Sequence, residues 1–175
     1  PEYAPPNLNT EGAKVQSDWL FNFFHNPIII RPNLQVRMPS FNLEDEEWNA
    51  IIRAFQYSDN DLLAFESDHH VDQSTTQFKA GEKLYELGAC NNCHFHGTEF
   101  PKQGAQTWAP NMALTKERLQ SDWVVDWLRD PQVIMPGTKM PAPYLPEAEI
   151  LELPGAASDW GQYVISIGGD REIML

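Results

Sequence analysis

The chain has 175 residues, a formal net charge of −13, and an apolar share of 42% that includes six Trp and nine Phe. This composition is enough for a packed core and excludes a disordered chain. The acidic surplus excludes nucleic acid as a partner, because phosphate backbones are bound by clustered Lys and Arg, and it favours a partner with a basic docking face.

The first segment in chain order returns later in the chain. Residues 4–41 read APPNLNTEGAKVQSDWLFNFFHNPIIIRPNLQVRMPSF, and residues 109–144 read APNMALTKERLQSDWVVDWLRDPQVIMPGTKMPAPY. Both contain Ala-Pro, then Gln-Ser-Asp-Trp, then Asn-Pro or Asp-Pro, then a basic residue followed by Met-Pro. Trp19 pairs with Trp123 at an offset of 104 residues (123 − 19 = 104). Such internal similarity indicates two copies of one architecture.

The first copy predicts two helices. Ser17 or Asp18 can cap the N-terminus of a helix over residues 19–24. The acidic run at residues 44–47 places negative charge on the first turn of a second helix, in which apolar side chains recur at helical spacing. We expect that stripe to pack into the core; it consists of Trp48, Ile51, Ile52 and Phe55.

A polar, acidic stretch at residues 58–76 is typical of a linker. After it, helices are predicted over residues 78–87, 121–128 and 158–167, the last of them preceded by an insertion of about ten residues. The middle helix should end before Asp130-Pro131, because the residue before proline avoids helical geometry. Strand signals are weak, so the predicted fold class is all-α. The predicted domains are 1–57, the linker 58–76, and 77–175.

Both cysteines of the chain lie in Cys90-Asn91-Asn92-Cys93-His94. A thioredoxin-like redox pair would need alternating strands and helices. A zinc site would need four ligands, with His69, His70 and His96 available but no second cysteine pair, and a disulfide here would close almost no loop. The same motif attaches c-type haem, whose porphyrin edge takes both thiols while the histidine binds iron. We therefore expect one covalent haem c in this chain.

A hexacoordinate iron needs a second axial ligand, and Met140 is the strongest candidate. It lies in Pro136-Gly137-Thr138-Lys139-Met140-Pro141, where prolines on both sides stiffen the loop. A lone methionine is more often a core residue than a ligand, but the basic-Met-Pro unit recurs in the first copy. The rival ligands are Met112, Met135 and His96, of which His96 lies very near the attachment motif.

These residues resemble class I c-type cytochromes. The resemblance covers residues 78–167 and includes Gly81 and Tyr85 on the first helix, the Cys90–His94 motif, Ala109-Pro110-Asn111-Met112, the Met140 loop and the helix at Trp160. It implies a small cytochrome c-like helical fold in which the first and last helices cross. The insertion near residues 145–157 departs from the pattern.

The resemblance also implies roles around the haem. The carbonyl of Pro110 would accept a hydrogen bond from the second ring nitrogen of His94, which orients the ring. Met112 would lie against the haem. Trp108 either donates a hydrogen bond near the haem carboxylates or packs as an ordinary apolar side chain.

The first copy resembles only the distal, methionine-bearing half of such a domain. Arg37-Met38-Pro39 would be its ligand unit, yet residues 1–57 hold no Cys-x-x-Cys-His motif. Two explanations stay open: a tandem dihaem protein in which Met38 serves a haem attached outside this chain, or a remnant that packs on the second copy. The aromatic side chains that it retains favour the first.

The resemblance implies one-electron transfer, within a tandem or multihaem respiratory chain, rather than catalysis. Haem attachment of this kind is completed outside the cytoplasm, so we expect a periplasmic or extracytoplasmic location. The alternative is a peroxidase-like haem enzyme or a gas sensor with a labile sixth ligand. No run approaches the roughly 20 apolar residues of a membrane span, so we expect membrane anchoring only through sequence outside this chain.

Overall fold

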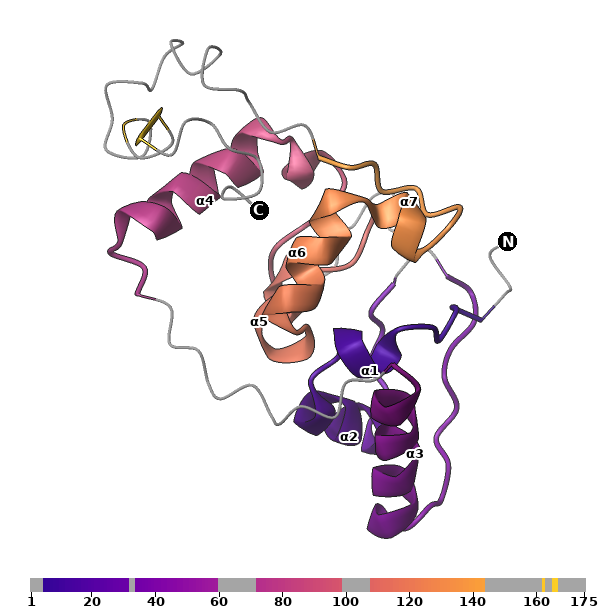
Figure 1. Cartoon of the computed structure of the whole chain (residues 1–175). Helices are drawn as coiled ribbons and strands as arrows, with labels where there is room; N and C mark the ends of the chain where they lie inside the picture. Colours follow the sequence, from indigo (N-terminus) through magenta and orange to yellow (C-terminus); the bar gives the residue numbers. More distant parts are fainter. Residues whose placement is uncertain are drawn as a thin grey trace. The chain divides into compact units, whose positions relative to one another are not determined.

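The computed structural model describes residues 5–31, 34–59, 72–98, 108–143, 162 and 165–166, and every regular element in these ranges is helical. This confirms the all-α prediction. The α-helices in chain order are α1 (Glu11–Lys14), α2 (Ser17–His25), α3 (Asp45–Ser58), α4 (Thr76–Leu87), α5 (Thr115–Arg118), α6 (Ser121–Arg129) and α7 (Pro131–Ile134), with 3₁₀ turns η1 (Cys90–Asn92) and η3 (Met112–Leu114) (Figure 1).

The chain forms two compact units, which are described separately. The first unit contains residues 1–67 and 93–124, and the second contains residues 68–92 and 125–175. The first unit therefore includes parts of both copies of the repeat. The domain boundaries at residues 57 and 76 stay a prediction.

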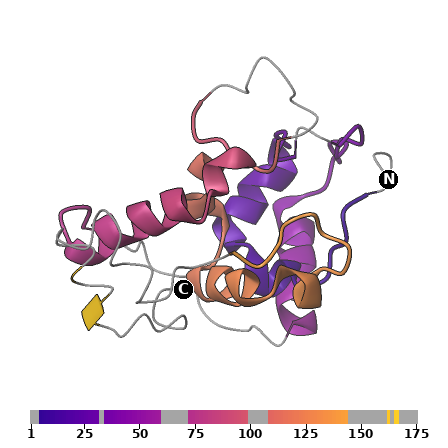
Figure 2. The same cartoon turned by 90° about the horizontal axis from the view of Figure 1, so that it is seen from above.

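The core of the first unit is built on α2 and α3, which pack together beside α1 (Figures 1 and 2). The helical spacing of the apolar residues puts Leu20 and Phe24 on one face of α2, and Trp48 and Ile52 on one face of α3. Phe24 stacks on Trp48 with 4.6 Å between ring centroids, which adds a favourable aromatic contact to the burial of both rings. The buried members are Val15, Leu20, Phe24, Trp48 and Ile52.

Helix α1 lies directly against the C-terminal end of α3. A Cβ atom on Gly12 would lie 2.3 Å from the carbonyl oxygen of Phe55, so only glycine permits this approach. The carboxylate of Asp59 accepts hydrogen bonds from the amide of Gly12 at 2.7 Å and from that of Ala13 at 3.2 Å. Asp59 thus satisfies amides that the first turn of a helix leaves without intrahelical partners.

The internal repeat is present in the structure as equivalent helices. Helices α1 and α5, and likewise α2 and α6, have equal lengths and lie 104 residues apart (115 − 11 and 121 − 17). The two copies meet at an antiparallel bridge between Val15 and Leu119. The amide of Gln16 donates to the carbonyl of Arg118 at 2.9 Å, and the amide of Gln120 donates to that of Lys14 at 3.0 Å. The copies are therefore joined through equivalent segments, residues 14–16 of the first copy and residues 118–120 of the second.

The two glutamines also cross-link the copies through their side chains. The Gln16 amide group donates to the carbonyls of Lys116 and Leu119, both at 2.8 Å. Gln120 donates to the equivalent carbonyls of the other copy, at 3.0 Å and 3.3 Å. Every bond has its counterpart at the 104-residue offset, so this interface has approximate two-fold symmetry.

The predicted cap of α2 is wrong. The helix begins at Ser17, its N-cap residue is Gln16, and the Gln16 side chain makes no capping bond. The physical reason is that Gln16 uses its amide to bind the other copy, while Ser17 accepts a hydrogen bond from Gln56 at 2.8 Å. Helix α6 begins at the equivalent residue, Ser121.

Helix α4 of the second unit confirms the helix predicted ahead of the cysteines. The Thr75 hydroxyl accepts a hydrogen bond from the amide of Phe78 at 3.2 Å and caps its first turn. The final predicted helix, at residues 158–167, lies outside the described residues except for Gln162, Ile165 and Ser166, which are helical. Its crossing with α4 and the insertion at residues 145–157 lie outside them too.

We expect Gly12→Ala to destabilise the protein by more than about 2 kcal/mol, because the new methyl group would overlap the backbone at Phe55. Helix propensity alone predicts the opposite sign, a gain of about 1 kcal/mol. Urea unfolding of the two proteins measures the difference. A gain in stability would contradict the close packing of α1 on α3.

His25 provides a pH-dependent contact. Its Nδ1 lies 2.9 Å from the carbonyl of Phe21 and its Nε2 lies 3.1 Å from the carboxylate of Asp45, so both nitrogens donate when the ring is protonated. The backbone hydrogen bond, and then Asp45, raise the pKa of His25 above 6.5. The contribution to stability is therefore complete below pH 6.5 and is lost as the pH rises through the folded-state pKa.

Asp45→Asn should lower the pKa of His25, because it replaces a charged acceptor that favours the imidazolium by a neutral amide. An NMR titration of the His25 ring measures the shift. Glu46→Gln, on the same exposed turn of α3, is the matched control and should leave this pKa nearer its original value. Equal pKa values in the wild type and in Asp45→Asn would show that the carboxylate contact is absent in solution.

Candidate functional site

The site begins where α4 ends. The amide of Gly88 donates to Leu84 at 2.8 Å, and Ala89 then adopts a left-handed φ of 54°. A non-glycine residue there costs about 1 kcal/mol or more, and this conformation turns the chain into η1, which carries Cys90. Cys90 is half-buried and Cys93 is exposed, and they are not joined in a disulfide. Cys90 belongs to the second unit, whereas Cys93 and His94 belong to the first.

In the first unit, residues 93–97 are held alongside residues 109–112. The amide of Ala109 donates to Cys93 at 3.0 Å, and the amide of Met112 donates to Phe95 at 2.9 Å. The Asn111 side chain completes the pairing: its Nδ2 donates to the carbonyl of Gly97 at 2.6 Å, and its Oδ1 accepts from the Gly97 amide at 3.3 Å. These bonds fix the backbone on both sides of His94.

His94 lies opposite Pro110 in this pairing. Its Nδ1 is 2.8 Å from the carbonyl oxygen of Pro110, which confirms the hydrogen bond that the sequence resemblance implies. A carbonyl oxygen only accepts, so the proton is on Nδ1 and the lone pair of the neutral ring is on Nε2. Proline has no amide hydrogen, and its carbonyl is the hydrogen-bonding group that its backbone offers. The geometry selects the tautomer in which Nε2 can bind a metal.

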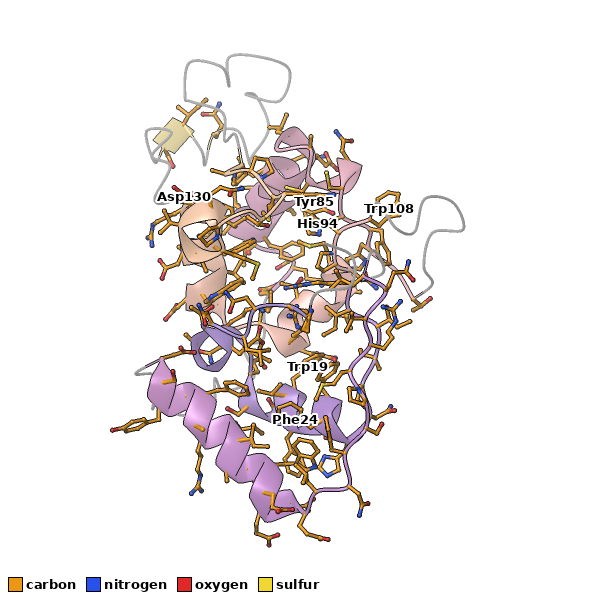
Figure 3. All side chains as sticks on the ribbon, turned by 90° about the vertical axis from the view of Figure 1, so that its right-hand side faces the viewer. Trp19, Phe24, Tyr85, His94, Trp108 and Asp130 are labelled. Atoms are coloured by element: carbon orange, nitrogen blue, oxygen red, sulfur yellow. The ribbon has the colours of Figure 1, made fainter. Side chains whose placement is uncertain are left out.

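Aromatic and sulfur-containing side chains lie along this pair of segments. Phe95 meets Trp108 edge to face with 6.0 Å between ring centroids, and Figure 3 shows Trp108 near His94. Met112 is half-buried, and its sulfur lies 3.9 Å from the hydroxyl of Thr115. The haem-facing roles of Trp108 and Met112 stay predictions.

Met140 belongs to the second unit and follows a turn that is braced by α7. Asp130 caps α7 by accepting from the amides of Gln132 and Val133, at 3.1 Å and 3.4 Å. The Gln132 side chain accepts from the Gly137 amide at 3.2 Å. Gly137 has a φ of 84°, in the left-handed region that glycine adopts readily. The loop is thus held by hydrogen bonds as well as by its prolines.

The sulfur of Met140 accepts a hydrogen bond from the indole nitrogen of Trp127 at 2.9 Å. Sequence reasoning did not identify Trp127 as a site residue. The sequence feature that could have identified Trp127 is its place in the repeat, where the first copy has Phe23 (127 − 104 = 23). A phenyl ring cannot donate a hydrogen bond of this kind. The second copy therefore provides its methionine with a donor that the first copy lacks.

Met38, the equivalent methionine of the first copy, is half-buried and packs against the core of the first unit. Its neighbours are apolar, as expected for a thioether in a core. Its proposed role as a ligand to a haem attached outside this chain stays a prediction. His69 and His70 lie outside the described residues.

In the described ranges, no three His, Cys, Asp or Glu side chains gather as a potential metal site. None of the helices in these ranges is long and apolar enough to cross a membrane. Comparisons of the chain with protein families, curated proteins and solved structures gave no match.

Asn111→Ala should destabilise the protein by about 1–3 kcal/mol, because it leaves two backbone groups of Gly97 without their partners. It should also broaden or shift the NMR signal of the His94 Nδ1 proton. Asn111→Asp is the matched control: it keeps an acceptor for Gly97 and loses only the donor, so its effect should be smaller. An unchanged His94 signal in Asn111→Ala would mean that this pairing does not hold the ring.

Proposed function

We propose that this chain is an electron-transfer protein that carries haem c, attached through Cys90 and Cys93, with His94 as an axial ligand. The observation that carries the proposal is the His94–Pro110 hydrogen bond, which directs the lone pair of the ring to Nε2 immediately after a Cys-x-x-Cys pair. A cytochrome c-like fold around the haem is part of the same proposal, and the all-α structure supports it.

The donor set fits a covalent haem. Two thiols are available to form thioether bonds, since neither is in a disulfide. The neutral imidazole of His94 is a strong ligand for iron, and the hydrogen bond at its Nδ1 increases its basicity and holds the ring plane. A half-buried thioether is available at Met140. Together these groups supply a covalent attachment and two axial ligands of different hardness.

Met140 is the proposed second axial ligand. Its loop is fixed by the Asp130 cap and the Gln132 side chain, so little conformational freedom is lost when the sulfur is held in place. Trp127 already orients the sulfur by donating to it. A thioether has a second lone pair, so this hydrogen bond is compatible with a bond from sulfur to a metal.

The bound haem would supply a one-electron ferric–ferrous couple. The chain's residues would set the relative stability of the ferric and ferrous iron. A soft sulfur ligand favours ferrous iron and raises the reduction potential, while the His94–Pro110 contact strengthens the nitrogen ligand. The apolar rings of Phe95 and Trp108 would limit access of water. No side chain has to move a proton or bind a substrate, so no catalytic residue is required.

The net charge of −13 favours docking to a redox partner with a basic face. The repeat supports a tandem arrangement in which Met38 serves a second haem attached outside this chain. Covalent haem attachment of this type implies the periplasm or another extracytoplasmic face, within a respiratory electron-transfer chain.

The proposal is tested first by haem extraction and absorption spectroscopy, and then by replacement of the axial methionine. The purified protein should retain its haem after acid-acetone extraction, and its ferric form should show the weak far-red band of a sulfur–iron bond.

Met140→Ala should abolish that band and allow CO to bind the ferrous form, since it opens the sixth position. Met112→Leu and Met135→Leu are the matched controls and should retain the band. Extraction of all the colour would refute covalent attachment, and ready CO binding by the wild type would favour the enzyme or sensor alternative.

A further inference from the structure

Two cationic side chains are buried at the two-fold interface of the first unit. Lys14 and Arg118 hold equivalent positions in the two copies and are only 3% and 8% exposed. Each lies over the tryptophan of the other copy: Lys14 Nζ is 5.6 Å from the ring centroid of Trp123, and Arg118 Cζ is 5.5 Å from that of Trp19. The ring faces attract the cations, but they do not neutralise them.

Among the described residues, Glu11 provides the negative charge that acts on these cations. Glu11 forms an ion pair with Lys14. The side chain of Arg118 has no ion pair or hydrogen bond to the described residues, and its Nε is fully buried without a partner among them. Arg31 adds a third positive charge close enough to act on both. In the part of the chain that the structure describes, these three cations therefore share the Glu11 carboxylate.

The protonation behaviour of the cluster agrees with this imbalance. Burial lowers the pKa of Lys14 to about 8 and that of Arg118 to about 10. The Glu11 carboxylate opposes this lowering of the pKa, whereas the neighbouring cations add to it. Burying a charge without a partner is strongly unfavourable, and proteins avoid it by pairing the charge. Lys14 can lose its proton within a moderate pH range, but a guanidinium stays charged. Arg118 is therefore the group whose buried charge would be stabilised most by a bound anion.

We infer that Lys14 and Arg118 form a buried binding site for a carboxylate group. A guanidinium presents parallel N–H groups that match the two oxygens of a carboxylate, and the unpartnered Nε of Arg118 is one of these donors. The carboxylate has two possible sources. One is a free small anion, and the other is a carboxylate of the haem, a source that rests on the proposed function.

The experiment uses the full chain in its haem-bearing form and in a haem-free Cys90→Ala/Cys93→Ala form. Sodium acetate is titrated against sodium chloride at constant ionic strength and pH 7, and the thermal midpoint is measured. Acetate should raise the midpoint of the haem-free form by a few degrees more than chloride does, because it binds only the folded chain. Arg118→Gln should abolish this difference. Arg53→Gln, which alters an exposed arginine of α3, should retain it.

The haem-bearing form distinguishes the two sources. If acetate no longer stabilises it, the haem carboxylate fills the site, and if acetate still does, a free anion fills it. In either case Arg118→Gln should lower the midpoint of the occupied protein. The inference is overturned if acetate acts only as chloride does and Arg118→Gln raises the midpoint, as removal of an uncompensated buried charge would.

A second measurement does not depend on any variant. The ¹³C resonance of labelled acetate should broaden on addition of the haem-free chain and sharpen again with excess unlabelled acetate; an unaffected resonance would count against the site. Haem content is measured on the same samples by the absorbance of the pyridine complex. A chain without covalent haem would refute the proposed function and leave the acetate result to decide this site by itself.

Discussion

The first unit depends on the pairing of the two copies of the repeat through one short segment in each. Val15 and Leu119 form the bridge, and Gln16 and Gln120 each bind two carbonyls of the opposite copy. Reciprocal bonds of this kind satisfy carbonyls near the C-terminal ends of α1 and α5, which lack partners within those short helices. The price of this arrangement is that Lys14 and Arg118, which flank the bridge, are buried with it.

The same pairing supports the functional site along the chain. Residues 110–119, which include η3 and α5, connect the bridge residue Leu119 to this site. The Met112 amide donates to the carbonyl of Phe95, and the carbonyl of Pro110 accepts a hydrogen bond from His94 Nδ1. The segment that orients the histidine is therefore tied at one end to the repeat interface.

The two methionines show how one repeat supports two environments. Met38 packs among aromatic and aliphatic side chains, where a thioether fills space. Met140 has its sulfur engaged by an indole N–H and its backbone held by a braced turn. The difference between Phe23 and Trp127 gives the second copy an indole N–H that donates to the Met140 sulfur.

The sequence by itself determined the helical class, the existence of the repeat and the Cys-x-x-Cys-His motif, because helical spacing, Gln-Ser-Asp-Trp and Cys-x-x-Cys-His are local patterns. It also led, by resemblance, to the His94–Pro110 contact. Only the tertiary structure decided that the glutamines before the two helices bind the opposite copy, that Trp127 donates to Met140, and that the Arg118 Nε is buried without a hydrogen-bond partner among the described residues. These contacts join residues that are 13 to more than 100 positions apart, and the burial of a charge depends on every segment packed around it. Local periodicity carries no information about either.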